Sequence, residues 1–216
     1  MSDTYMTVAG PVTVQTEEKR SVFEAWVRRV SSESEAKAVI EKARVTHPGA
    51  GHHCWAYLVG PGREIYRSSD DGEPGGTAGL PMQEVLQGSP YTDVVAVVTR
   101  WFGGVLLGSG GLVRAYSGAV RAALAQAQPL TRERVQLATA EVGHDIAGRL
   151  EHDLRARGIE VRDVEYGAGV RFQTAISPAD LEAANGLLAA MTGAAQAWEF
   201  CETDWVDQKP DSVGLG

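Results

Sequence analysis

The sequence predicts an α+β protein built from two domains. Its 216 residues suit one large or two small domains, and stretches of strand period alternate with stretches of helix period along the chain. Charge also divides the chain, because residues 1–130 carry 12 Lys and Arg against 13 Asp and Glu, whereas residues 131–216 carry 8 against 15. We therefore expect one domain in residues 1–130, a second in residues 131–206 and a flexible tail in residues 207–216.

Strands and helices alternate through the first half, and local signals mark their ends. Alternating apolar residues predict two strands joined by a hairpin at residues 17–20. Ser32 and Glu35 form a capping-box pattern at the start of a helix, and Pro81 and Gly88 delimit another. The expected strands are residues 13–16, 21–30, 52–59, 64–67 and 92–101, and the expected helices are residues 32–45, 80–86 and 109–127.

The second half follows the order strand, helix, strand, strand, helix, strand. This βαββαβ order is typical of a ferredoxin-like domain. Gly158 ends the first helix, and Ser177 before Pro178 predicts the N-cap of the second. The expected strands are residues 135–142, 160–166, 170–176 and 195–203, and the expected helices are residues 145–157 and 177–191.

Composition excludes several classes of protein. The sequence contains no apolar run approaching the roughly 18 residues of a membrane span, and its start lacks the pattern of a secretory signal. We therefore expect a cytoplasmic protein with no membrane partner. Cys54 and Cys201 lie far apart and outside any Cys-x-x-Cys pair, which argues against a disulfide framework and a structural zinc site. We expect no cofactor and no metal.

Residues 70–116 are unusually rich in glycine, with 10 glycines among 47 residues. Glycine is tolerated at this density where the backbone turns with positive φ or closely approaches another group, so we expect something to lie against these loops. Ser109 and Gly110 stand where a P-loop needs Lys and then Ser or Thr. Val113 replaces the third glycine of a dinucleotide fingerprint, and Leu107 breaks the Gly-x-Ser-x-Gly elbow of a hydrolase.

The predicted helix at residues 109–127 has a glycine-rich start formed by Gly108, Ser109, Gly110 and Gly111. Such a start exposes unpaired backbone N–H groups at the positive end of the helix dipole. Two interpretations stay open: an anion or phosphate site, and an ordinary helix start capped by Ser109.

Arginines provide all the side-chain charge around this helix. Residues 94–132 contain no acid but include Arg100, Arg114, Arg121 and Arg132. A helical wheel places Arg114 and Arg121 opposite the apolar face, free to meet a partner. The resulting positive field would attract phosphate, although it is weaker than in a dedicated nucleic-acid-binding domain.

His52, His53 and Cys54 suggest a metal site or a general base. On a strand, His52 and Cys54 share one face and His53 points the other way, so the three cannot bind one ion without a bulge. Either histidine can act as a general base. The alternative is a packed thiol flanked by one histidine that hydrogen-bonds at the sheet edge and another that reaches the loops.

Three carboxylates lie close together in the sequence, at Asp70, Asp71 and Glu73. Paired carboxylates can divide acid and base roles or hold magnesium. Asp-Gly and Glu-Pro are also turn sequences. We favour a structural turn in which Asp71 or Glu73 pairs with an arginine.

Residues 52–116 contain a series of short, different motifs at characteristic spacings. They are His52-His53-Cys54, Asp70-Asp71-Gly72-Glu73-Pro74, Gly76-Thr77-Ala78-Gly79, Pro81-Met82, Arg100, Phe102-Gly103-Gly104, Leu107-Gly108, Gly110-Gly111-Leu112 and Arg114-Ala115-Tyr116. This set resembles the IMPACT family, and within it the bacterial YigZ branch, with a match from about residue 15 to residue 205. The sequence departs from the family at Leu80, where lysine is expected, and at Trp101 and Phe102, where tyrosines are commoner.

The resemblance implies a fold and a field of function. The N-terminal domain would be an α/β sandwich similar to the second domain of the small-subunit ribosomal protein five superfamily, followed by a ferredoxin-like domain. This tandem is similar to the last two domains of elongation factor G. Eukaryotic members regulate translation by competing for an activator of the amino-acid-starvation kinase, a pathway that bacteria lack, so that partner does not carry over.

Our leading hypothesis is a non-enzymatic, translation-linked regulatory protein that contacts RNA, the ribosome or a ribosome-associated protein through the first domain. One alternative is an enzyme or a small-ligand site for phosphate or nucleotide, built from the three carboxylates and two histidines. Another is a protein–protein adaptor that uses the acidic second domain. We assign no catalytic residue. The candidate contacts with RNA or a ligand are His52, His53, Asp70, Asp71, Glu73, Thr77, Arg100, Gly103, Gly104, Gly108, Ser109, Gly110, Gly111, Arg114, Tyr116 and Arg121.

Overall fold

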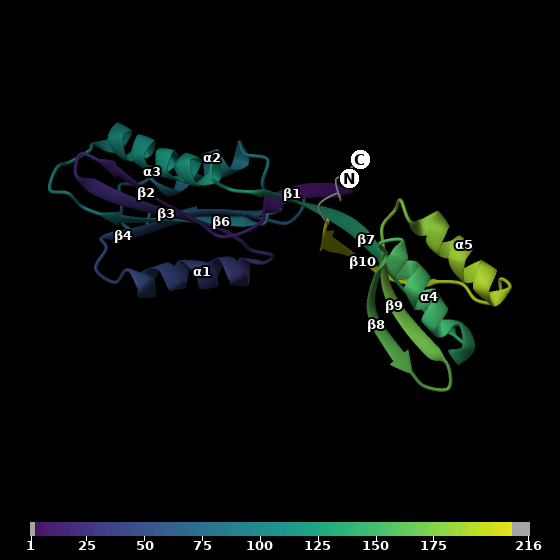
Figure 1. The fold of residues 1–216 in the computed structure, drawn as a ribbon. Helices are drawn as coiled ribbons and strands as arrows, with labels where there is room; N and C mark the ends of the chain where they lie inside the picture. Colours follow the sequence, from purple (N-terminus) through teal and green to yellow (C-terminus); the bar gives the residue numbers. More distant parts are fainter. Residues whose placement is uncertain (1–2, 209–216) are drawn as a thin grey trace, which may run out of the picture. The chain divides into compact units, whose positions relative to one another are not determined.

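The computed structural model describes residues 3–208 and divides them into two compact units (Figure 1). Residues 5–131 form the first unit, and residues 132–208 with residues 3 and 4 form the second. Both contain strands and helices, which confirms the predicted α+β class. The predicted tail lies outside the described residues from position 209 onward, and Asp207 still belongs to a strand.

The first unit is built on one five-stranded antiparallel sheet with the order β2-β3-β6-β4-β5. The predicted hairpin and central strands are present. An additional strand, β1 (Thr4–Val8), was not predicted. The sheet strands are β2 (Val12–Glu18), β3 (Ser21–Arg29), β4 (His52–Val59), β5 (Ile65–Ser69) and β6 (Val94–Trp101), and the helices are α1 (Glu33–Thr46), α2 (Gly79–Gln87) and α3 (Ser109–Leu124).

Helices cover both faces of this sheet. Successive side chains of a strand point to opposite faces, so Phe23 and Cys54 join the core beneath α2 and α3, while Trp26 and Tyr57 pack with α1 on the other face. Figure 1 shows α2 and α3 on one side of the sheet and α1 on the other. In this three-layer arrangement the glycine-rich loops follow β5 and β6, near the start of β4 and directly before α3.

Local sequence signals account for two of the element ends. Lys19 and Arg20 both have positive φ, of 48° and 69°, as required in a two-residue hairpin turn between β2 and β3. Ser32 accepts a hydrogen bond from the backbone N–H of Glu35. The Glu35 carboxylate accepts one in return from the N–H of Ser31, so the reciprocal half of the cap forms one residue before the N-cap.

The second unit contains the βαββαβ order and the strand order β10-β7-β9-β8, in which β1 also joins the sheet beside β7. This is the strand arrangement of a ferredoxin-like fold. Its core includes Leu150 and Leu154 of the first helix against Phe172 of the sheet. The elements are β7 (Pro129–Val142), α4 (His144–Ala156), β8 (Glu160–Tyr166), β9 (Val170–Ile176), α5 (Leu181–Thr192) and β10 (Glu199–Asp207).

Several predicted boundaries in this unit were wrong. The strand β7 begins at Pro129 instead of residue 135, and β10 ends at Asp207 instead of residue 203. The Ser177 hydroxyl hydrogen-bonds Asp180, so this segment forms a turn and α5 begins only at Leu181 with Asp180 as its N-cap. The last strand begins at Glu199 instead of residue 195. Trp198 is buried there and donates a hydrogen bond from Nε1 to the carbonyl of Ala184, which draws the chain toward α5 before the strand starts.

Candidate functional site

The loop after β5 is held together by the carboxylate of Asp70. Its Oδ1 accepts hydrogen bonds from the N–H groups of Ala78 and Gly79 at 2.9 and 2.8 Å, and its Oδ2 accepts one from Gly76 at 2.8 Å. Burial raises the pKa of Asp70, but these three donors lower it more, so its pKa lies below the usual value. Asp70 therefore closes the loop and stays ionised at neutral pH.

Asp71 connects the same loop to the layer of α1. Its Oδ1 accepts a hydrogen bond from Arg44 at 3.0 Å, and its Oδ2 accepts one from the backbone N–H of His53 at 2.7 Å. The His53 ring is buried and donates from Nε2 to the carbonyl of His47 at 3.2 Å. Burial lowers the pKa of His53, which favours its neutral form. His53 thus lies away from His52, as the strand period predicted.

Glu73 lies at the centre of a buried polar cluster. Its Oε1 accepts hydrogen bonds from Arg100 Nη1 and from the Tyr116 hydroxyl, both at 2.6 Å. The side chains of Glu73 and Arg100 are only 3% and 7% exposed. Asp71 and Glu73 therefore both pair with an arginine, in agreement with the turn interpretation.

The same cluster fixes the loop that follows β6. Ser21 Oγ accepts hydrogen bonds from the Gly103 N–H at 3.1 Å and from Arg100 Nη2 at 3.4 Å. The Gly103 backbone packs directly on the backbone of Arg20 and Ser21, leaving no room for a Cβ. The guanidinium of Arg100 also lies 5.6 Å from the ring centre of Phe102.

Two predicted contacts, Tyr116 and Thr77, are structural parts of these loops, and Cys54 is the packed thiol that the sequence offered as one interpretation. Tyr116 is fully buried, which raises the pKa of its hydroxyl, and that group donates to Glu73. Thr77 is also buried, and its hydroxyl donates to the carbonyl of Pro74. Cys54 is buried, its thiol donates to the carbonyl of Asp70, and burial raises its pKa, so it is not an activated nucleophile.

A cavity of about 490 Å³ opens between these loops and the start of α3. His52, Glu73 and Arg100 form its polar wall, and Ser109 lies at its edge. The other part of the lining is apolar. It consists of Pro74, Phe102, Leu106, Leu107 and Leu112. We call this space the loop cavity.

The first turn of α3 borders the loop cavity. The N-cap is Gly108, with φ of 73°, and no side chain among residues 3–208 caps the helix. Ser109 and Gly110 are exposed. Gly111 is buried, and a Cβ there would lie 2.9 Å from the Cβ of Leu107. The backbone N–H groups of the first turn are therefore available to an anion.

The arginine-rich surface is smaller than the sequence predicted. Arg100, expected to meet a partner, is buried by its pairing with Glu73, and Arg132 pairs with Asp207. Arg114 and Arg121 are both exposed on α3, and Arg121 donates to Ser117 at 3.1 Å. No acidic side chain in the described part of the chain forms an ion pair with Arg114.

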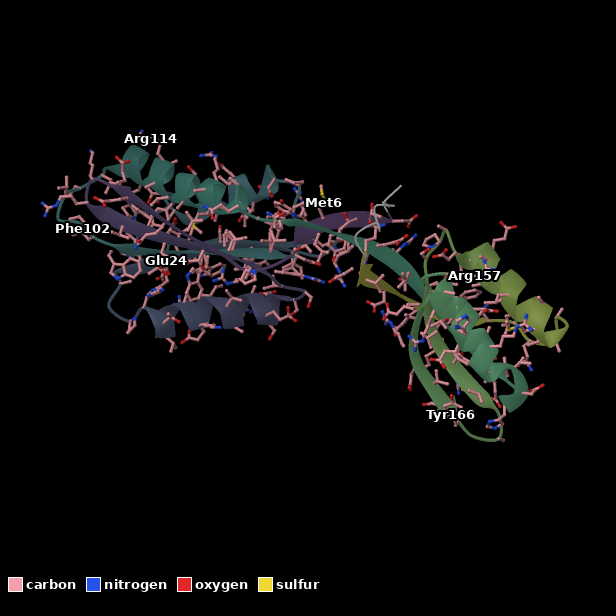
Figure 2. All side chains as sticks on the ribbon, viewed as in Figure 1. Met6, Glu24, Phe102, Arg114, Arg157 and Tyr166 are labelled. Carbon is pink, nitrogen blue, oxygen red and sulfur yellow. The ribbon has the colours of Figure 1, made fainter. Side chains whose placement is uncertain are left out.

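One end of the first unit combines Arg114 with apolar side chains, whereas Arg121 lies in the last turn of α3. Phe102, Val105 and Leu106 are 57%, 39% and 82% exposed. Figure 2 shows Phe102 and Arg114 at the same end, beside the start of α3. Val105 and Leu106 were not among the predicted site residues, although the apolar Val-Leu-Leu run between Gly104 and Gly108 was the signal available.

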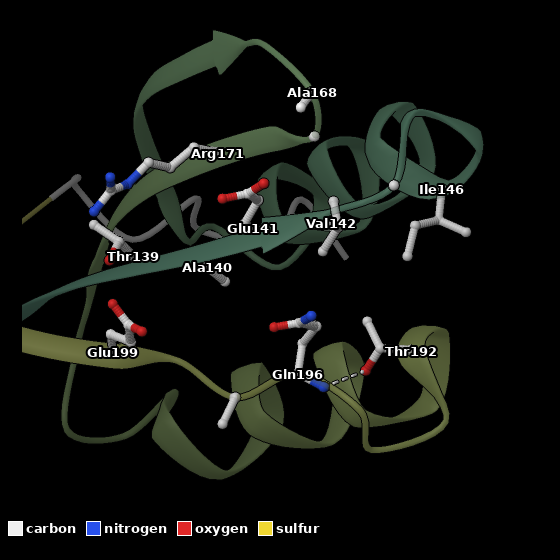
Figure 3. A pocket seen from close by; sticks show the side chains of 13 residues that line it. Thr139, Ala140, Glu141, Val142, Ile146, Ala168, Arg171, Thr192, Gln196 and Glu199 are labelled. Atoms are coloured by element: carbon white, nitrogen blue, oxygen red, sulfur yellow. Dashed lines mark hydrogen bonds between the residues drawn. The ribbon is translucent and has the colours of Figure 1, made fainter.

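A larger cavity, of about 770 Å³, lies in the second unit (Figure 3). Glu141, Arg171 and Glu199 from the sheet and Thr192 and Gln196 from α5 and the following loop contribute to its lining. Two carboxylates against one guanidinium make it unfavourable for an anion. It contains none of the predicted site residues, so we place the candidate site in the first unit.

The described residues contain neither a metal-binding cluster nor a membrane-spanning helix. Within residues 3–208, no group of three or more His, Cys, Asp and Glu side chains is arranged to hold a metal ion. No helix in this part of the chain has the length and apolar character needed to cross a membrane.

The chain is similar to known proteins over most of its length. A family model described as "Impact N-terminal domain" matches residues 19–124, and one described as "Domain of unknown function (DUF1949)" matches residues 141–195.

"IMPACT family member YvyE" of Bacillus subtilis is 37% identical over 165 residues, covering 76% of each chain. "IMPACT family member YigZ" of Escherichia coli is 45% identical over 134 residues, covering 61% of this chain and 64% of that protein. A crystal structure described as that of a hypothetical protein matches with a TM-score of 0.74 and 34% identity, covering 94% of this chain and 99% of that one.

Gly103→Ala should destabilise the first unit. The added Cβ would lie 2.1 Å from the backbone carbon and oxygen of Arg20, and such overpacking costs about 1–3 kcal/mol. Gly118→Ala is the matched control, because a Cβ there has nothing within 4 Å and alanine is the better helix former. Urea denaturation measures both, and equal stability of the two variants would contradict the close approach at Gly103.

Glu73→Gln should reduce the free energy of unfolding by about 3–5 kcal/mol, because it leaves the buried Arg100 cation without its counter-charge. Tyr116→Phe, which removes one hydrogen bond to the carboxylate, should cost about 1.5–3 kcal/mol. The double variant Glu73→Gln/Arg100→Gln should lose less than the sum of its single changes. Strict additivity in urea denaturation would show that the two side chains are not coupled.

Asp70→Asn should reduce stability by about 2 kcal/mol at pH 7, because a neutral amide accepts the three backbone hydrogen bonds poorly. The folded pKa of Asp70 is lowered, so the stability it contributes is fully present above its unfolded pKa of about 3.9 and is lost as pH falls through the lower, folded value. The difference between wild type and variant should therefore be constant from pH 5 to 7 and shrink below pH 4. A difference in the free energy of unfolding that grows on acidification would contradict this assignment.

Proposed function

The chain belongs to the IMPACT family, and from that membership we propose that it is a translation-linked regulatory binding protein. In this proposal it contacts RNA, the ribosome or a ribosome-associated protein through the first unit, and it acts in the cytoplasm, where ribosomes are. The observation that carries the proposal is the exposed surface formed by Phe102, Val105, Leu106 and Arg114 around the start of α3, with Arg121 on the same side of that helix in its last turn. We call this the loop surface.

The chemistry of the loop surface suits single-stranded RNA. Proteins that bind such RNA combine cations that follow the backbone with an aromatic side chain on which a base stacks. Arg114 and Arg121 are seven residues apart on α3, so they lie on one side of the helix. Phe102 is more than half exposed, which leaves its ring available to a base.

The loop surface is also pre-organised, which lowers the cost of binding. Ser21 holds Gly103 directly after Phe102, and the Glu73–Arg100 pair fixes the end of β6. Side chains presented by a fixed loop lose less conformational entropy when a partner binds.

The double variant Arg114→Glu/Arg121→Glu should lose ribosome retention in a co-sedimentation experiment at low salt. If each arginine contacts one phosphate of single-stranded RNA, losing both should flatten the slope of log K against log salt by about 1.4. Phe102→Ala should weaken retention without changing this slope, because stacking releases no counterions.

Lys37→Glu/Lys42→Glu provides the matched control. It makes the same change of charge with two exposed residues of α1, on the opposite layer of the same unit. Retention should be that of wild type. The proposal fails if the α3 variant sediments with ribosomes like wild type, or if both variants lose retention equally, which would indicate a response to net charge alone.

A further inference from the structure

We propose that the loop cavity binds a nucleoside monophosphate unit, either free or at the end of an RNA strand. The inference deepens the proposed function and rests on it for the RNA source. It assigns the phosphate to the first turn of α3 and the base to the apolar wall that includes Phe102.

The loop cavity has the size and lining of a ligand site. Its volume of about 490 Å³ lies within the range of about 300–1,000 Å³ that small-molecule sites occupy. Most of its lining side chains are apolar, and a few are fixed polar groups. A ligand that fills it should therefore combine a ring-sized apolar or planar body with a small number of polar atoms.

The start of α3 is suited to a phosphate monoester. Gly108 leaves the N–H groups of Ser109, Gly110 and Gly111 without a side-chain cap, and the Ser109 hydroxyl adds another donor. The Arg114 guanidinium lies over the same turn, because its Nη1 is 3.6 Å from the position that a Cβ of Gly110 would take. This set of donors, with the helix dipole and a cation, favours a dianion with three oxygens over a carboxylate.

A second, independent observation also points into the loop cavity. Arg100 lines it and is only 6% exposed, yet its Nε is buried without a hydrogen-bond partner among the described residues. Buried donors of this kind normally find an acceptor. Because Arg100 is a lining residue, we expect a ligand oxygen placed against the guanidinium to be the acceptor for this donor, while Glu73 already balances the charge of the guanidinium.

His52 adds a ring nitrogen to the polar part of the loop cavity. Its Nδ1 lies 2.9 Å from the carbonyl oxygen of Asp71, and because a carbonyl only accepts, Nδ1 carries a proton. Its Nε2 lies 4.0 Å from Oε1 of Glu73. A ribose hydroxyl, which can both donate and accept a hydrogen bond, is a suitable partner for this nitrogen and carboxylate.

Isothermal titration calorimetry of the full chain with adenosine 5′-monophosphate tests the proposal, with ribose 5-phosphate, adenosine and inorganic phosphate as comparison ligands. We expect the nucleotide to bind at least tenfold more tightly than any of its fragments. No heat of binding with the nucleotide would overturn the proposal. Equal affinity for nucleotide and inorganic phosphate would overturn the assignment of the base.

Two variants at Gly110 separate the phosphate site from folding. This position is exposed, and a Cβ there meets only the end of the flexible Arg114 side chain. Gly110→Asp places a carboxylate on the first turn of α3, where it stabilises the helix and competes with phosphate. It should weaken nucleotide binding at least tenfold, whereas the neutral isostere Gly110→Asn should retain it and melt at a similar temperature. Equal binding by the two variants would overturn the assignment of the phosphate.

Short RNAs identify the source of the nucleotide and keep the two proposals distinguishable. If the end of an RNA is bound, a 5′-phosphorylated oligonucleotide should bind at least tenfold more tightly than its 5′-hydroxyl counterpart, and Gly110→Asp should abolish the difference. If free nucleotide binds and neither RNA does, the site binds a small ligand, and the proposal that the nucleotide is the end of an RNA strand is wrong. Ribosome retention that depends on Arg114 and Arg121 but not on Gly110→Asp would leave the proposed function standing with this inference overturned.

Discussion

The buried ion pair of Glu73 and Arg100 is the constraint on which the rest of the site depends. Taking two charges out of water costs several kcal/mol per ion, and the attraction between them repays this only with good geometry and further hydrogen bonds. Here the further bond comes from Tyr116. Such a pair does little for stability relative to apolar side chains, but it does define position, because it joins the loop after β5 to the end of β6 and to α3.

The glycines around this pair follow from the same constraint. Because Arg100 reaches inward to Glu73 and Ser21, the chain that leaves β6 passes close against the β2–β3 hairpin, and only Gly103 fits there. The carboxylate of Asp70 holds the opposite loop through three backbone donors. Some of the glycines in this region therefore allow close packing, as Gly103 does. Others form a helix start without a side-chain cap, as Gly108 does.

The sequence was sufficient for the architecture, because period-2 and period-3.6 patterns directly report which faces are buried. It failed where a tertiary contact overrides a local signal: Trp198 draws the chain away from a strand that its neighbours favour, and Ser177 caps a turn instead of a helix. The candidate site was predicted as a set of residues but not as an arrangement. In the sequence, Arg100 stands in an acid-free segment and therefore resembles a surface cation. Only the fold shows that it pairs with Glu73, 27 positions away in the chain.

The burial of Arg100 changes how this surface can recognise a partner. Arg100 and Arg132 are paired with acids, so the positive field expected from the acid-free segment comes mainly from Arg114 and Arg121. The field of so few exposed charges is strongly screened at physiological salt. Affinity must then come from short-range contacts with the exposed apolar loop and the loop cavity. Short-range contacts discriminate shape and hydrogen-bonding pattern, which charge alone does not. A surface of this kind suits recognition of a particular local structure, such as a strand end or an unstacked base, better than general adhesion to a polyanion.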